Sequence, residues 1–173
     1  MAKKVLNGVL FNISWLLIVL AQDALLSWSV AAVHVCLHMW LLGRGRGELQ
    51  VVAIAAAMGI AVDQLLFTAG VLGNASGSTL APLWLSALWP VFATTLLHAF
   101  SGLRPYPALA ALVGGIGGYL SYRLGTALSG VAFAQPLMTD VVLLVFWGVL
   151  FPSLLVAAAQ VGRSMEDGDV SPA

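Results

Sequence analysis

Three histidines lie in apolar segments of this chain, and a cluster of all three is geometrically possible. His34 and His38 are four residues apart, so on a helix both point to the same face. His98 closes a later apolar run, and Asn7 lies early in the first one. Imidazoles on facing helices can bind zinc, another transition metal or a haem iron. The sequence nevertheless favours neutral, hydrogen-bonded packing histidines, so no cofactor is expected; proton handling, substrate contact and a metal site on His34, His38 and His98 are the alternatives.

Asp63 is the second group that could do chemistry, because an ionisable side chain inside a membrane is costly and marks a functional position by default. Arg123, preceded by Ser121 and Tyr122, lies at a comparable depth in a later apolar segment. An Asp63–Arg123 ion pair would offset the desolvation of both charges. Three interpretations stay open: the pair only joins two helices, it forms a polar site that opens outward, or the two never meet and Arg123 reaches the membrane interface.

Several well-marked function classes leave no trace in the sequence. The metalloprotease, nucleophile-elbow and P-loop motifs do not occur, and three histidines are too few for a membrane di-iron lipid oxidase. A single cysteine, Cys36, excludes an intramolecular disulfide. The formal net charge is zero, and no nucleic-acid partner is expected.

The composition requires lipid around these polar groups. Of 173 residues, 61% are hydrophobic and only 8% are charged, whereas a soluble domain typically carries about 25% charged residues. A soluble fold of this size leaves roughly a third of its unfolded surface in water, which is incompatible with so much apolar area. We therefore predict one all-α membrane domain over residues 1–162, followed by a flexible acidic cytoplasmic tail over residues 163–173.

Six segments are long and apolar enough to be transmembrane helices, each of which needs about 20 mainly apolar residues. Connections rich in glycine, proline, serine or charge separate them. The basic N-terminus is read as the start of a retained first helix rather than as a cleaved signal peptide. The predicted spans cover residues 5–21, 24–42, 50–72, 82–100, 105–126 and 140–162.

The basic residues predict the orientation of this six-span bundle. All but one fall on the same side of it, and only Arg123 lies near the opposite side. Because cytoplasmic connections are enriched in lysine and arginine, both termini are predicted to be cytoplasmic. The residues on the cytoplasmic side are Lys3, Lys4, Arg44, Arg46, Arg104 and Arg163.

Small residues and prolines indicate how the spans pack. Gly114 and Gly118 are four residues apart in the predicted fifth span, and this spacing lets another helix approach closely in lipid. Packing inside one bundle is favoured, and a homodimer through these two glycines is the alternative. Pro90 and Pro152 lie inside the predicted fourth and sixth spans, where each removes a backbone donor and favours a kink.

Four stretches carry a resemblance to a known family: LNGVLFNISWLLIVL, GIAVDQLLFTAGVL, APLWLSALWPVFATTLLHAF, and a glycine-rich segment that ends in LSYRLG. Together they resemble a family of small bacterial integral inner-membrane proteins of unknown function, often encoded near cyclopropane-fatty-acyl-phospholipid synthase. The resemblance covers residues 5–162. The pair His34 and His38 departs from it. The positions that match the recurrent ones of the family are Asn12, Trp15, Asp63, Pro82, Trp84, Trp89, Thr95 and His98.

The resemblance implies a role in the modification of fatty-acyl lipids within the bacterial inner membrane. The chain would act as an enzyme or as an accessory partner of a lipid-modifying enzyme, and whether it catalyses a reaction stays open. We expect His98 or Asp63 to supply acid–base chemistry or head-group contacts. The expected contacts to the lipid substrate are Trp84, Trp89, Phe92, Thr95, Asn12, Arg123 and Tyr122.

Two other functions remain as alternatives. A small transporter or channel would use Asp63 and Arg123 to line a polar path, although polar residues are sparse at the centre of the predicted spans. A docking partner for other membrane enzymes would use its polar residues only as contacts between helices.

Overall fold

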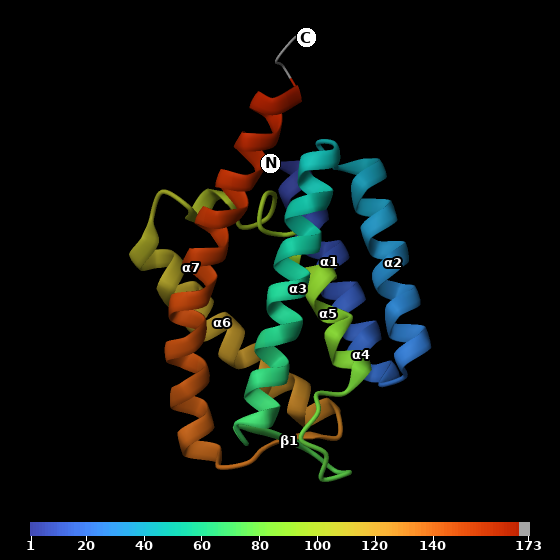
Figure 1. Ribbon diagram of the computed structural model, residues 1–173, viewed down its shortest axis with the longest axis vertical. Helices are drawn as coiled ribbons and strands as arrows, with labels where there is room; N and C mark the ends of the chain where they lie inside the picture. Colours follow the sequence, from blue (N-terminus) through green and yellow to red (C-terminus); the bar gives the residue numbers. More distant parts are fainter. Residues whose placement is uncertain (170–173) are drawn as a thin grey trace.

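The chain folds into a helical bundle closed at one end by two short strands. The computed structural model describes the backbone of residues 1–169 and the side chains of residues 1–162. Figure 1 shows that α1 begins, α2 turns into α3, and α7 ends at the same end of the bundle, here called the terminal end. The elements are α1 (Ala2–Ala21), α2 (Ala24–Leu41), α3 (Arg46–Thr68), β1 (Leu72–Asn74), α4 (Leu83–Ser86), α5 (Leu88–Ala93), the 3₁₀ helix η1 (Ser101–Leu103), α6 (Pro107–Leu128), β2 (Val131–Phe133) and α7 (Pro136–Asp169).

Four helices in the described part of the chain are long and apolar enough to cross a membrane: α1, α2, α3 and the portion of α7 over Pro136–Gly162. This makes the chain a multi-pass membrane protein. The predicted number of six spans is not confirmed by length and composition, because the fourth segment is broken and α6 is not among these four helices.

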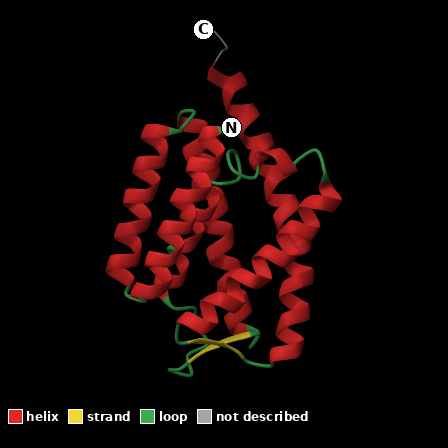
Figure 2. Ribbon diagram, turned by 180° about the vertical axis from the view of Figure 1, so that it is seen from behind, coloured by secondary structure: helices red, strands yellow, loops and turns green. Residues whose placement is uncertain are grey.

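The strands β1 and β2 were not predicted. They pair antiparallel, with Gly73 opposite Ala132, and lie away from the terminal end (Figures 1 and 2). α3 ends before β1 because Gly70 adopts a φ of 68°, a conformation that glycine takes without steric cost and that commonly closes a helix. The predicted third span, residues 50–72, therefore ends four residues after the end of α3, and α3 begins four residues earlier than predicted.

The predicted fourth span is a broken segment buried in the middle of the bundle (Figure 1). The break lies at Ala87, whose N–H donates to the Trp84 carbonyl at 3.2 Å. Pro90 contributes to it, because a proline has no N–H for the carbonyl four residues earlier and its ring collides with that carbonyl. Beyond α5, the hydroxyls of Thr94 and Thr95 donate back to backbone carbonyls at 2.7 and 2.6 Å. Irregular backbone at membrane depth is tolerated where protein surrounds it.

The glycine-rich face of α6 packs against α7 of the same chain. A Cβ on Gly114 would lie 2.4 Å from the Phe151 side chain, and one on Gly118 would lie 2.2 Å from Trp147. Figure 2 shows α6 crossing the bundle obliquely beside α7. The two glycines thus let the large α7 side chains approach the α6 backbone, and a homodimer through them stays a prediction.

The last helix is longer than predicted at both ends. α7 begins at Pro136 and stays helical through Pro152 to Asp169. The backbone of residues 163–169 is therefore helical within the segment predicted to be a flexible tail. Residues 170–173 lie outside the described residues, and the flexibility of the tail stays a prediction.

Candidate functional site

A cavity of about 400 Å³ lies between α1, α6 and the broken α4–α5 segment. Its size falls in the range of about 300–1,000 Å³ that is usual for small-molecule sites. On α6 its walls extend from Val113 to Thr126, which is about 20 Å along a helix. Exposed residues such as Asn12 on α1 and Leu120 on α6 also belong to its walls, so the cavity communicates with the outer surface. It is an elongated cavity that opens sideways.

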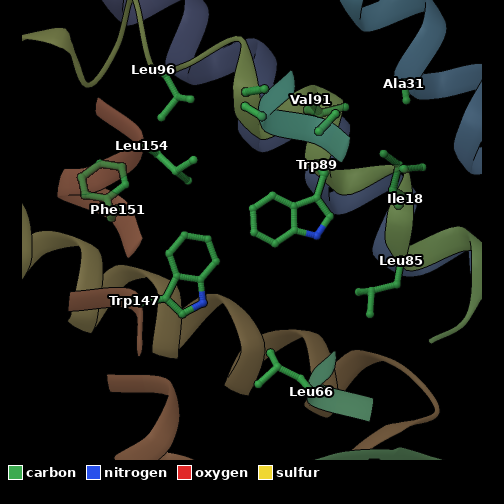
Figure 3. Packing of buried hydrophobic residues seen from close by; sticks show 14 of the residues in the cluster. Ile18, Ala31, Leu66, Leu85, Trp89, Val91, Leu96, Trp147, Phe151 and Leu154 are labelled. Carbon is green, nitrogen blue, oxygen red and sulfur yellow. The ribbon is translucent and has the colours of Figure 1, made fainter. Parts of the chain in front are cut away.

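Aromatic residues make up nine of the 25 residues that line the cavity. The indoles of Trp89 and Trp147 stack with centroids 5.6 Å apart, and the Phe92 ring stands at 89° to Trp147 at 5.5 Å. Figure 3 shows Trp89 and Trp147 with their rings facing each other across the core. A Cβ on Gly59 would lie 1.8 Å from the Trp89 ring, so α3 needs a glycine there to seat this indole. The aromatic lining consists of Phe11, Trp15, Trp84, Trp89, Phe92, Phe100, Tyr122, Trp147 and Phe151.

Among the residues that the structure describes, Asp63 is the only charged one in the cavity wall. Its side chain is buried, with 1% exposure. The Trp89 indole N–H donates to Oδ2 at 2.7 Å, and the Tyr122 hydroxyl donates to Oδ1. These donors fix both carboxylate oxygens, which is what a buried carboxylate requires. The result is one anchored acidic group in a wall that is mainly apolar and aromatic.

Most of the predicted substrate contacts lie on this cavity. Trp84, Trp89, Phe92, Asn12 and Tyr122 line it together with Asp63. Thr95 and Arg123 do not belong to its lining. The Thr95 side chain is buried, and its hydroxyl donates to the Phe92 carbonyl at 2.6 Å. Thr95 therefore stabilises the irregular turn after α5 instead of facing the cavity.

Asp63 and Arg123 do not pair. The Arg123 Nε lies 3.4 Å from Oδ1 of Asp140 and donates to the Tyr119 hydroxyl at 3.2 Å. Its guanidinium carbon lies 5.2 Å from the centroid of the Phe133 ring. Arg123 is exposed beside β2, and Asp63 is satisfied by Tyr122, the neighbour of Arg123 in the sequence. One residue along a helix turns the side chain by about 100°, which explains why the pair expected from depth alone does not form.

A second polar cluster lies at the terminal end and joins two of the three histidines. Nε2 of His38 and Nε2 of His98 lie 2.7 and 2.6 Å from the same oxygen, Oε1 of Glu48. The other oxygen of Glu48 accepts the Arg44 backbone N–H at 2.8 Å. All three side chains are buried, with at most 4% exposure. Their ligand atoms lie within 4.8 Å of one another, close enough to hold one metal ion.

Asn7 fixes the orientation of His38 in this cluster. Its Nδ2 faces Nδ1 of His38 at 3.2 Å, and its Oδ1 accepts the Ala99 backbone N–H at 3.2 Å. Because an amide nitrogen only donates, Nδ1 of His38 must accept this hydrogen bond. The imidazole proton of His38 is therefore on Nε2, which faces Glu48. The predicted proximity of Asn7, His38 and His98 is thus present in the structure.

His34 stands apart from this cluster. Its Nδ1 lies 2.9 Å from the Ser14 hydroxyl, and its Nε2 lies 3.0 Å from the Thr94 hydroxyl. The favoured sequence interpretation, a buried and hydrogen-bonded packing histidine, describes His34 well. The three-histidine set considered for a metal therefore does not converge, because both ring nitrogens of His34 are engaged by hydroxyl groups and Glu48 is the third member of the cluster.

The sequence did not point to Glu48, nor to Trp147 and Phe151 on α7, which line the cavity. Glu48 falls in the predicted connection between the spans 24–42 and 50–72, but α3 begins at Arg46 and includes it. A glutamate in the first turn commonly turns back to a preceding backbone N–H, as Glu48 does to Arg44. That helix-start signal, together with histidines at the same predicted depth, would have identified it.

His98 and Asp63 cannot act on the same reacting group. Asp63 lies 15 residues after Glu48 on α3, which corresponds to about 22 Å along the helix axis. His98 contacts Glu48 and does not line the cavity. Of the two residues expected to do acid–base chemistry on a lipid, only Asp63 lies on the cavity.

Comparison with known proteins identifies a family. The family model described as "Protein of unknown function (DUF2878)" matches residues 4–153. This agrees with the resemblance to a family of unknown function that the four sequence stretches carry. No curated protein and no solved structure matches the chain.

Proposed function

This chain belongs to the DUF2878 family of proteins of unknown function, and we propose that its cavity binds the fatty-acyl part of a membrane lipid. The protein would act in acyl-lipid modification, as an enzyme or as an accessory that presents the lipid. One observation carries this proposal: a single buried carboxylate, Asp63, lies in the wall of an elongated aromatic cavity that opens sideways.

The shape and lining of the cavity favour an acyl chain. A long apolar chain gains free energy from each methylene removed from water, about 0.8 kcal/mol, but little from moving between two apolar surroundings. Selection inside a bilayer therefore depends on shape and on polar contacts. The wall along α6 from Val113 to Thr126 and the rings of Trp15, Trp84 and Phe92 supply the shape.

Asp63 supplies the polar contact. It lies 17 residues after Arg46, the first residue of α3, or about 25 Å along the helix. Its carboxylate, held by Trp89 and Tyr122, suits a hydrogen-bond donor of the lipid head group or a proton transfer at the lipid. Tyr122 lines the cavity beside it and would move the same proton or orient the same group.

We further propose that the broken α4–α5 segment and α6 complete a six-span bundle in the bacterial inner membrane, with both termini in the cytoplasm. Lys4 packs beside Gly102, and Arg44 and Arg46 lie in and next to the α2–α3 turn at the same terminal end (Figure 1). Cytoplasmic connections are enriched in such residues. In this orientation Asp63 lies in the outer half of the bilayer.

The geometry gives less support to transport. A polar path through Asp63 and Arg123 requires both residues on one cavity, whereas Arg123 pairs with Asp140 outside the lining. Two aromatic residues, Trp89 and Tyr122, hold the Asp63 carboxylate, and the wall as a whole is mainly apolar. This favours a lipid site over a path for ions or polar solutes.

Asp63→Asn is the substitution that tests the role of the cavity in cells. The amide keeps the size of the side chain but replaces one acceptor oxygen by a donor, which then faces the Trp89 or the Tyr122 donor. Cells that lack the gene are expected to change in one defined acyl-lipid species. A plasmid copy with Asp63→Asn should fail to restore that species, while the wild-type copy restores it, as measured by comparative lipid mass spectrometry.

The matched control is Asp140→Asn, because Asp140 is also a carboxylate but pairs with Arg123 and does not line the cavity. This variant should restore the lipid profile like the wild type. An unchanged acyl profile in the deletion strain would overturn the role in acyl-lipid modification. Restoration of the lipid profile by Asp63→Asn would show that the Asp63 carboxylate has no role in the proposed function.

A further inference from the structure

We propose that His38, His98 and Glu48 form a binding site for a divalent transition-metal ion, with Zn²⁺ as its probe. The site lies at the terminal end of the bundle and is separate from the lipid cavity, since none of its three residues lines that cavity. It joins α2, α3 and the segment after α5, which are far apart in the sequence.

The donor set fits such an ion. Two imidazole nitrogens and one carboxylate oxygen are the ligands that zinc and ferrous iron take in sites with an open position. Both Nε2 atoms converge on Oε1 of Glu48, at 2.7 Å from His38 and 2.6 Å from His98. Nearly complete burial, at most 4% exposure, removes the solvent that would otherwise compete for these ligands.

Binding requires small movements of all three ligand side chains, whose ligand atoms lie within 4.8 Å of one another. Bonds of about 2.0–2.2 Å in tetrahedral geometry separate neighbouring ligand atoms by about 3.3 Å. The Glu48 oxygen therefore has to withdraw by roughly half an ångström from each histidine. Its second oxygen is held by the Arg44 N–H at the first turn of α3, which keeps the carboxylate directed toward the histidines.

Asn7, the hydrogen-bond partner of His38, must change its side-chain orientation when the metal binds. Without a metal, its Nδ2 faces Nδ1 of His38. Coordination through Nε2 moves the imidazole proton to Nδ1, and that N–H needs an acceptor. Asn7 supplies one if its amide turns so that Oδ1 replaces Nδ2, at the loss of its contact with the Ala99 N–H. Asn7 is thus the second-sphere residue that sets the metal affinity.

Zinc titration of the full chain tests the site. The protein, purified in detergent and stripped with a chelator, is titrated with Zn²⁺ by calorimetry and with Co²⁺ by visible absorption. We expect about one ion per chain and a Co²⁺ spectrum typical of a site with nitrogen and oxygen ligands. Glu48→Gln and His98→Gln should each weaken binding by at least about 10–100-fold.

His34→Gln is the matched control, because His34 is buried on the same helix as His38 but bonds Ser14 and Thr94 instead. Its affinity for Zn²⁺ should equal that of the wild type. Asn7→Asp places a permanent acceptor at Nδ1 of His38 and should strengthen binding by about tenfold.

Two results would overturn the proposal. The first is a folded wild-type protein that takes up no stoichiometric Zn²⁺ and gives no Co²⁺ spectrum from bound ligands. The second is a loss of affinity in His34→Gln as large as in Glu48→Gln. Circular dichroism checks whether the Glu48 variant folds. If it does not fold, the Co²⁺ spectrum of the wild type still decides the test.

Discussion

Glu48→Ala is expected to destabilise the metal-free protein by at least about 3 kcal/mol. The substitution leaves the Nε2–H groups of His38 and His98 and the Arg44 backbone N–H without their acceptor. A buried donor that loses its partner costs about 1–3 kcal/mol, and these three are buried or partly buried. The free energy of unfolding, measured by SDS titration in mixed micelles after chelator treatment, reports this loss.

Asp23→Ala is the control for this prediction. Asp23 also accepts a backbone N–H at a helix start, from Leu26 at 2.8 Å, but it is exposed. Loss of such a cap typically costs about 1 kcal/mol. Equal destabilisation by the two substitutions would contradict the idea that Glu48 holds α2, α3 and the segment after α5 together.

Gly117→Trp is expected to abolish acyl-lipid binding while the bundle stays folded. Gly117 lines the cavity on α6, and a Cβ there would meet no atom within 4 Å. The first side-chain atom therefore meets no collision, and we expect the indole to occupy the space proposed for the acyl chain. We expect phospholipid that copurifies with the protein, quantified per chain by mass spectrometry, to fall by at least about tenfold, which corresponds to 1.4 kcal/mol.

Ile116→Trp provides the comparison on the same helix. Ile116 is 46% exposed and does not line the cavity, so its indole points away from the proposed lipid. This variant should retain as much phospholipid as the wild type. If both variants retain lipid equally, the copurified lipid lies on the outer surface and the cavity is not its site.

The helical architecture was predictable because lipid imposes it. A span must satisfy its backbone internally, so apolar runs of sufficient length, separated by glycine, proline and charge, locate the helices within a few residues. The start of α3 and the strands β1 and β2 were missed for local reasons. The charged start of α3 resembles a loop in composition, and Val71 and Leu72 extend the apolar run past Gly70, where the helix ends.

The candidate sites were predictable in part. Depth placed His38 and His98 in one layer and singled out Asp63, because both follow from counting residues along a helix. Depth does not give the rotation of a helix about its axis. That rotation decides that Tyr122 and not Arg123 contacts Asp63. His34 lies on the same helix face as His38 but one turn deeper, where it contacts Ser14 and Thr94.

The central claim, that the cavity holds an acyl chain, is tested most directly by photocrosslinking in a membrane. The protein is reconstituted with a phospholipid that carries a diazirine on its acyl chain, irradiated, and mapped by peptide mass spectrometry. The proposed function predicts adducts concentrated on cavity residues such as Trp15, Trp84 and Phe92. Adducts confined to exposed outer positions such as Val33 and Val149, with none on the cavity wall, would contradict it.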